Sequence, residues 1–212
     1  MNKKKYLEKL KIDLKKSVDF FASQNKAERE IWVVQEFLTN LGIFFSRDEL
    51  ESNKDDPPDV RFNNAEFEIK EILDKNRQRH REYKEALLKV ATAQGPEDFF
   101  EQYMPRDIST SGVYDLIYGK SLELLPKYPL ASRNNLDLLF YVNLQDYSID
   151  LNQSFPDISE LINHGWRSVS FLMYFESCIL YASNSAPAFI KRHAGKVISR
   201  GQTLKDVGDK GH

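Results

Sequence analysis

The stretch DPPDVRFNNAEFEIKE, residues 56–71, alternates apolar and polar side chains on either side of the pair Asn63-Asn64. Alternation with a period of two is typical of β-strands, and asparagine adopts positive φ angles more readily than most residues. We therefore predict a hairpin with a two-residue turn. Counting outward from that turn, Asp59 and Glu68 lie directly opposite each other on one face.

Two carboxylates that face each other across a hairpin repel. Their Cβ atoms would be about 4.5–5.5 Å apart, and like charges at that spacing destabilise a sheet unless water or a cation lies between them. Lys70 points to the same face because side chains alternate. Magnesium binds one or two carboxylates, keeps several waters and uses substrate phosphate oxygens for its other positions. The hairpin therefore predicts a Mg²⁺ or Mn²⁺ site formed by Asp59 and Glu68, with Lys70 beside it.

The rest of the chain is predicted to alternate between helices and strands. Apolar residues at intervals of three and four indicate helices over about 4–23, 26–41, 75–93 and 114–125, and shorter ones within 97–104 and 186–195. Apolar runs indicate strands at 43–46, 59–62, 65–72, 136–144, 168–175 and 178–183. We expect the first two helices to form an antiparallel pair, and the run 136–144 to be a central strand covered on both faces.

Length and composition favour one sizeable domain with a real core, since 41% of the 212 residues are apolar. The net charge of −2 indicates no polyanionic partner by itself, so any nucleic-acid surface must be local. The single cysteine, Cys178, excludes an intramolecular disulfide and suits a reducing compartment. There is no signal-peptide pattern and no run of 18 apolar residues, so we expect a cytoplasmic protein without membrane association.

Other common chemistries lack their motifs in this chain. The sequence has no Cys/His zinc spacing, no glycine-rich phosphate or dinucleotide loop and no Gly-x-Ser-x-Gly elbow. Trp166 could stack on a nucleic-acid base, but the usual burial of tryptophan favours a core position.

Pro58-Asp59, a gap of eight residues and then Glu68-Ile69-Lys70 resembles the motif of the PD-(D/E)XK nuclease superfamily. The resemblance implies that Asp59, Glu68 and the carbonyl of Ile69 hold the metal, while Lys70 positions or polarises the attacking water. It also implies an α/β fold with a restriction-endonuclease-like α-β-β-β-α-β core and a mixed sheet. To that core we add the N-terminal helical pair and a C-terminal β extension.

The same resemblance implies a further acidic residue, because this superfamily often adds one from the helix before the first strand. Glu30 shares a helical stripe with Val34, Phe37 and Leu41, so it is a carboxylate on an otherwise core-facing surface. Glu30 is the candidate for an additional metal ligand. An ion pair with an arginine would also explain its position.

A second resemblance covers residues from about 25 to 192. The segments EREIWVVQEFL (28–38), PPDVRF with FEIKEIL (57–62 and 67–73) and GWRSVS (165–170) look like a family of bacterial proteins of about this length. That family was catalogued first as a domain of unknown function and later as candidate endonucleases. It implies no particular substrate.

A basic stripe follows the motif strand directly. Four residues share one predicted helical face and could contact nucleic-acid phosphates: Arg77, His80, Arg81 and Lys84. The alternative is an ordinary solvated face with ion pairs between residues four apart.

These inferences combine into one hypothesis. We expect a single domain over residues 1–200, with an N-terminal helix (1–24), a nuclease-like core (25–145) and a C-terminal β/α extension (146–200), followed by a flexible tail (201–212). Its expected activity is Mg²⁺- or Mn²⁺-dependent endonucleolytic hydrolysis of phosphodiester bonds in DNA, with RNA as the second choice. The alternatives are a non-catalytic nucleic-acid-binding or protein-interaction module with the same fold, and a structural subunit with an internal set of ion pairs.

Overall fold

The computed structural model describes residues 2–53, 56–99 and 104–200. The chain folds into two compact units, which we describe separately. The smaller unit consists of Met1–Arg29 and Lys75–Met104, and the larger consists of Glu30–Asp74 and Pro105–His212. Helix α2 (Lys26–Asn40) begins in the smaller unit and continues into the larger one. The domain boundaries predicted from the sequence stay a prediction.

The smaller unit is helical. It contains α1 (Lys3–Phe20), the 3-10 turns η1 (Ser23–Asn25) and η3 (Pro96–Phe99), and α3 (Arg79–Val90). Helix α1 packs along α3, and at its end the rings of Phe21 and Tyr83 stack with centroids 5.1 Å apart. The guanidinium of Arg79 lies 4.0 Å from the centroid of the Phe21 ring. Within the smaller unit, the helical partner of α1 is therefore α3.

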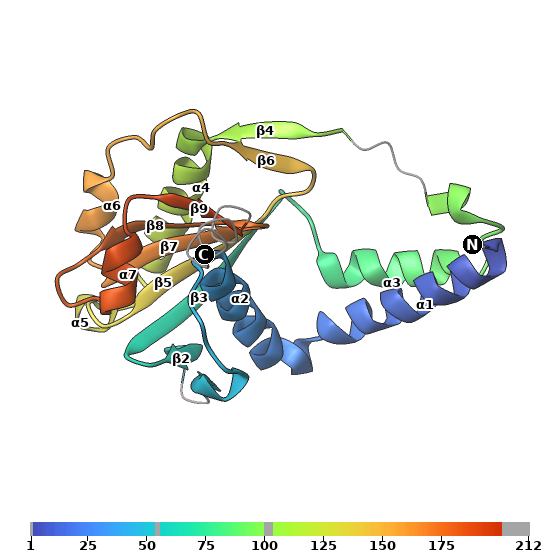
Figure 1. Cartoon of the computed structure of the whole chain (residues 1–212), viewed down its shortest axis with the longest axis horizontal. Helices are drawn as coiled ribbons and strands as arrows, with labels where there is room; N and C mark the ends of the chain where they lie inside the picture. The colour runs from blue at the N-terminus through green and yellow to red at the C-terminus, as the bar shows by residue number, and fades with distance from the viewer. Residues whose placement is uncertain (1, 54–55, 100–103, 201–212) are drawn as a thin grey trace, which may run out of the picture. The chain divides into compact units, whose positions relative to one another are not determined.

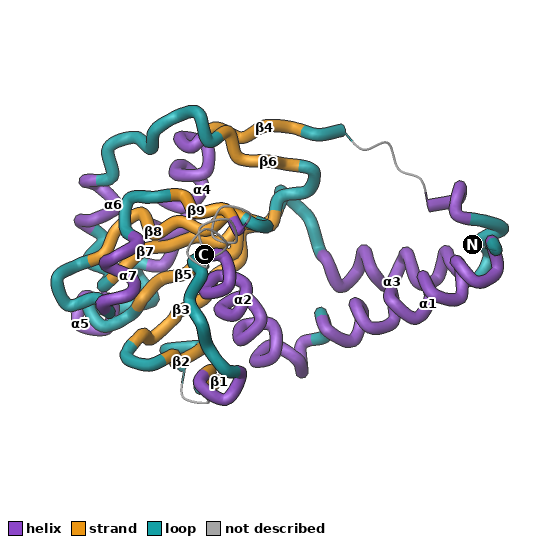
Figure 2. Tube along the Cα trace, in the orientation of Figure 1, coloured by secondary structure: helices purple, strands orange, loops and turns teal. Residues whose placement is uncertain are grey.

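The larger unit is built on a seven-stranded mixed sheet (Figures 1 and 2). In spatial order the strands are β1 (Leu50–Ser52), β2 (Val60–Phe62), β3 (Ala65–Leu73), β5 (Asp137–Asn143), β7 (Ser168–Met173), β8 (Glu176–Ala182) and β9 (Val197–Ser199). The three central strands, β3, β5 and β7, run parallel, and the outer pairings are antiparallel. The prediction of a central strand near residues 136–144 is confirmed by β5, whose residues are almost all buried.

Helices cover both faces of this sheet. On one face α4 (Thr110–Leu124) packs Ile117 into a core with Phe140. On the other face α2 places Phe37 against Phe67, with ring centroids 6.0 Å apart. Because side chains alternate along a strand, β3 directs residues 67 and 69 toward α2, and residues 68, 70 and 72 toward the α4 side.

Helix α2 ends where its sequence predicts. Gly42 has a φ of 68°, and the amide of Ile43 donates to the carbonyl of Leu38 at 3.0 Å. This is the geometry of a helix that ends at a glycine. The left-handed conformation of the glycine ends the helix, and the amides that follow it donate to the last free carbonyls of the helix. The following segment, 43–46, is not a strand, and the first strand is β1 instead.

The remaining elements are short. A separate two-stranded parallel sheet joins β4 (Arg106–Ser109) to β6 (Tyr147–Asp150). The other elements are the 3-10 turn η2 (Arg47–Glu49) and three helices, α5 (Leu130–Arg133), α6 (Ser159–Asn163) and α7 (Ala188–His193). Among the described residues, none of the helices combines the length and apolar character needed to cross a bilayer.

The observed α/β class and mixed sheet agree with the prediction from the sequence, but the predicted arrangement of the elements is wrong. The C-terminal strands are not an extension added to an α-β-β-β-α-β core, because β7 pairs directly with β5 and β8 and β9 continue the same sheet. The restriction-endonuclease-like architecture, with its N-terminal helical pair, is thus not the arrangement of this chain. Pairing between strands that are distant in the sequence depends on long-range packing, which local patterns do not reveal.

A candidate metal centre at the β2–β3 hairpin

The hairpin has the predicted register. Val60 pairs with Phe67, as expected from a turn at Asn63-Asn64, and Asn63 takes the positive φ of 52° that this turn requires. One residue further out, the amide of Asp59 donates to the carbonyl of Phe67 at 2.9 Å. Asp59 therefore stands beside β3 opposite Glu68, as the sequence predicts.

Three carboxylates converge at this point. Asp56, Asp59 and Glu68 each contribute one oxygen, and these oxygens all lie within 4.8 Å of one another. We call this group the carboxylate cluster. Asp59 is 3% exposed and Glu68 is fully buried, whereas Asp56 is exposed. Asp56 is not predicted from the sequence, because it lies in the loop before the hairpin, where strand alternation does not indicate which way a side chain points.

The two oxygens of Glu68 have different surroundings. Oε1 accepts from the ammonium of Lys70 and from the hydroxyl of Tyr128, the latter at 2.5 Å. Oε2 is buried and has no hydrogen-bond partner among the described residues. A buried polar atom without a partner is uncommon and costly, so a proton or a cation would fit at this oxygen.

The surroundings of Glu68 disfavour its charged form. Burial raises the pKa of Glu68 above its usual value, and the neighbouring Asp59 carboxylate raises it further. Lys70 and Tyr128 act in the opposite direction without cancelling the rise. Lys70 also lies 3.8 Å from Asp59 Oδ2, so one ammonium serves two buried carboxylates.

Asp59 and Tyr128 are held in place by the fold. Asp59 Oδ2 accepts from the amide of Ile69 at 2.8 Å, which fixes the carboxylate against β3. Burial and the adjacent Glu68 raise the pKa of Tyr128, so its hydroxyl remains a donor at neutral pH. Tyr128 follows α4 in a turn, sixty residues from Glu68, and no motif spacing in the sequence links the two.

Two other predicted ligands have less direct support. Glu30 is half-buried on α2 and is not one of the three clustered carboxylates. Helix α2 packs on the face of the sheet that carries Phe67, opposite to the face of Glu68. Ile69 is buried and contributes its amide to Asp59. Metal ligation by Glu30 and by the Ile69 carbonyl stays a prediction.

The predicted basic stripe lies in the smaller unit, on and just before α3. Arg77 donates to Glu82 at 3.1 Å, and Arg81 forms an ion pair with Glu85 at 2.7 Å. His80 is half-buried and Lys84 is exposed. Both arginines thus form ion pairs with nearby glutamates, and phosphate contact by the stripe stays a prediction.

Trp166 is a core residue, as its chemistry predicts. It is 2% exposed, and its indole donates to Ser121 Oγ at 3.0 Å. Its ring centroid lies 5.4 Å from that of Tyr128. Trp166 thus supports the wall of the candidate site without facing solvent.

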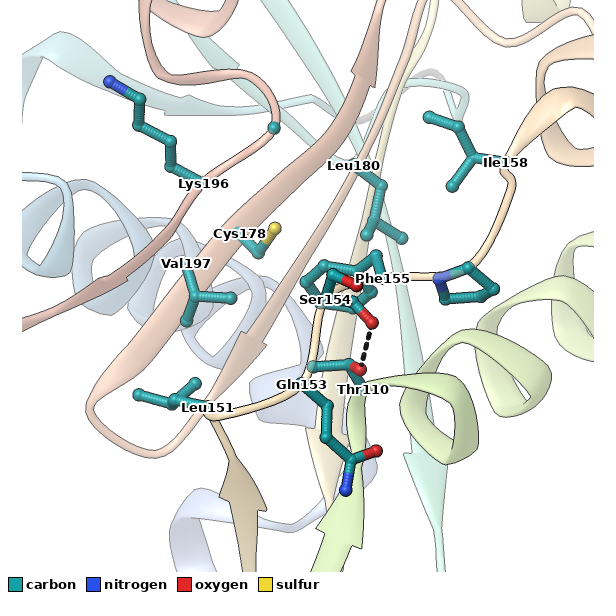
Figure 3. Close-up of a pocket in the computed structure, with 12 residues that line it drawn as sticks. Thr110, Leu151, Gln153, Ser154, Phe155, Ile158, Cys178, Leu180, Lys196 and Val197 are labelled. Carbon is teal, nitrogen blue, oxygen red and sulfur yellow. Dashed lines mark hydrogen bonds between the residues drawn. The ribbon is translucent and has the colours of Figure 1, made fainter.

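A cavity of about 630 Å³ lies elsewhere in the larger unit (Figure 3). It lies over β8 and β9, with Cys178, Leu180 and Val197 in its lining, and Lys196 also borders it. Burial raises the pKa of the Cys178 thiol to about 12, which agrees with an inert packing role. None of the lining residues belongs to the carboxylate cluster, so this cavity is separate from the candidate metal centre.

A family model matches almost the whole chain. The family described as "Putative endonuclease, protein of unknown function (DUF1780)" matches residues 2–204. No protein with curated annotation matches the chain.

Among solved structures, the chain is similar to a protein of unknown function from Pseudomonas aeruginosa strain PAO1, described as a member of the monooxygenase superfamily. The two are 26% identical, with a TM-score of 0.66, over 94% of this chain and 96% of the other. This likeness overturns the restriction-endonuclease-like fold class predicted from the motif.

Proposed function

We propose that this chain, which belongs to the DUF1780 family of candidate endonucleases, hydrolyses phosphodiester bonds of nucleic acids with a divalent cation bound at the carboxylate cluster. The observation that supports this most directly is the buried Oε2 of Glu68, which has no partner among the residues that the structure describes, on a side chain that clusters with two further carboxylates. Asp59, Glu68 and Lys70 occur in the order of the PD-(D/E)XK motif. Their proposed roles are therefore the roles of that motif, although the chain does not have the restriction-endonuclease-like fold.

The residues present fit Mg²⁺ or Mn²⁺. All donors in the cluster are carboxylate oxygens, which hard cations prefer over nitrogen or sulfur. Three carboxylates and the ammonium of Lys70 carry a formal charge of −2, which one divalent cation would cancel. Asp59 and Glu68 are the proposed principal ligands, with exposed Asp56 as a third and the Ile69 carbonyl as a further one.

Each side chain has a distinct task in this proposal. A bound divalent cation supplies Lewis acidity toward the phosphate and lowers the pKa of water. Asp59 is oriented by the amide of Ile69, so it needs no rearrangement to act as a ligand. The Lys70 ammonium, which contacts both buried carboxylates, can donate to the attacking water or to a phosphate oxygen and stabilise charge that develops there.

Cleavage assays test the proposal. Plasmid, single-stranded DNA and RNA are incubated with the purified protein, with Mn²⁺ or with chelator, and DNA is the expected preferred substrate. We expect Mn²⁺-dependent cleavage that falls by about 10²–10⁴-fold in Lys70→Ala, the usual size of a proton-transfer or charge-stabilising contribution. Lys120→Ala is the matched control, because Lys120 pairs with Glu123 on an exposed helix face. Cleavage that survives the chelator or Lys70→Ala would exclude this mechanism.

The basic stripe has its own test within the same proposal. Arg81 and Lys84 are exposed on α3, and we expect each to contact one phosphate. The double variant Arg81→Ala/Lys84→Ala should then reduce the slope of log K against log salt by about 2, since each phosphate contact releases about one counterion. Fluorescence anisotropy with labelled DNA across a salt series measures this slope. An unchanged slope would assign the stripe to ion pairing alone.

A further inference from the structure

We infer that Tyr128 is a positioning residue of the metal centre: together with Lys70 it holds Oε1 of Glu68, and this leaves Oε2 directed at the cation. The inference rests on the proposed cation site, and it adds a residue that lies outside the motif. Oε2 is then the oxygen of Glu68 that binds the cation.

The hydrogen bonds of Glu68 are unevenly divided. The Tyr128 hydroxyl and the Lys70 ammonium both donate to Oε1, and Oε2 receives no donor within the described part of the chain. A carboxylate that only formed an internal ion pair would be expected to satisfy both oxygens, because each buried lone pair left empty costs free energy. Two donors to Oε1 fix the rotation of the carboxylate and leave Oε2 available to a cation.

Tyr128 is itself rigidly supported. Arg133 donates to the carbonyl of Tyr128 at 2.5 Å and to that of Leu125 at 3.2 Å, which ties down the turn after α4. The buried ring of Trp166 packs beside the phenol. A donor held on both sides can orient a ligand without losing much conformational freedom when the cation binds.

A phenol suits this position better than a second cation would. Its hydroxyl donates one hydrogen bond but adds no formal charge, so it orients the carboxylate and leaves its attraction for a cation largely intact. Lys70 passes 5.8 Å from the centroid of the Tyr128 ring. The ring face therefore also helps to keep the ammonium over the cluster.

Tyr128→Phe tests the inference, because it removes the hydroxyl and keeps the ring that packs on Trp166. We expect the dissociation constant for Mn²⁺ alone, measured by calorimetry or by electron paramagnetic resonance, to rise about 10- to 100-fold, as for other groups that orient metal ligands. In cleavage assays the Mn²⁺ concentration for half-maximal rate should rise by the same factor, while the rate at saturating Mn²⁺ changes only a few-fold.

Two controls separate positioning from general stability. Tyr174→Phe removes a hydroxyl that donates to the Leu144 carbonyl, outside the cluster, and should leave Mn²⁺ binding unchanged. In a Glu68→Gln background, Tyr128→Phe should have no further effect on Mn²⁺ binding, because no carboxylate remains to be oriented.

The outcomes distinguish this inference from the proposed function. Wild-type Mn²⁺ affinity in Tyr128→Phe, with or without a lower unfolding temperature, would overturn the positioning role and leave the proposed nuclease activity intact. Weakened Mn²⁺ binding in a protein that cleaves no nucleic acid would support the positioning role and reject the nuclease. A wild-type protein that binds no Mn²⁺ would overturn both.

Discussion

Glu68→Gln should abolish metal-dependent cleavage and at the same time stabilise the metal-free protein. Loss of a principal ligand removes about 4 kcal/mol or more of transition-state stabilisation, which corresponds to about 10³-fold in rate. The gain in stability follows from the pKa of Glu68, which burial and Asp59 raise in the folded state. The neutral amide has nearly the same shape and avoids the buried charge.

The sign of the pH dependence follows from linkage. In the unfolded chain Glu68 titrates near its ordinary pKa of 4.5, and in the folded protein its pKa is higher. The folded state therefore binds more protons in the window above about pH 4.5, and stability falls as pH rises through the folded pKa. Glu68→Gln removes this contribution, so its unfolding temperature should exceed that of the wild type most clearly at neutral pH and converge with it near pH 4.5.

Thermal unfolding with and without Mn²⁺ measures both effects. At one hundred times its dissociation constant, Mn²⁺ should stabilise the wild type by about 2.7 kcal/mol, or several degrees, and should not stabilise Glu68→Gln. Glu66→Gln is the matched control, since Glu66 lies on the same strand and pairs with Arg61. A destabilised Glu68→Gln would identify Glu68 as part of a structural ion pair.

Asp137→Ala should be the most destabilising substitution at a charged residue. Asp137 is 1% exposed and accepts from Ser168 Oγ at 2.7 Å, from the Glu66 amide at 3.0 Å and from the Arg167 guanidinium. Removing the carboxylate leaves Arg167 without its buried partner, which typically costs about 3–5 kcal/mol. These contacts also tie β3, β5 and β7 together, so the loss affects the strand that carries Glu68.

Chemical denaturation measures this loss in the free energy of unfolding. In thermal unfolding, the same loss should lower the unfolding temperature by about 10 °C for a chain of this size. Glu123→Ala is the control, because its exposed pair with Lys120 is expected to contribute less than about 1 kcal/mol. A loss below about 1 kcal/mol in Asp137→Ala would mean that the Arg167 pair contributes little to the stability of the sheet.

Local pattern was enough to predict the β2–β3 hairpin. A two-residue turn at Asn63-Asn64 and strict alternation set the register, and the register places Asp59, Glu68 and Lys70 on one face. These are short-range consequences of backbone geometry, since shifting the pairing by one residue would turn every apolar side chain away from the core. The same reasoning holds for the buried strand β5 and for the end of α2 at Gly42.

Partners that are distant in sequence could not be predicted in this way. Asp56 reaches the cluster from an irregular loop, Tyr128 comes from a turn beyond α4, and α1 packs on α3. Periodicity states which side of an element is apolar, but many elements present such a side. Long-range packing over the whole core decides which of them meet. It therefore also decides that Tyr128 becomes the second donor to Glu68 and that Asp56 becomes the third carboxylate of the candidate metal centre.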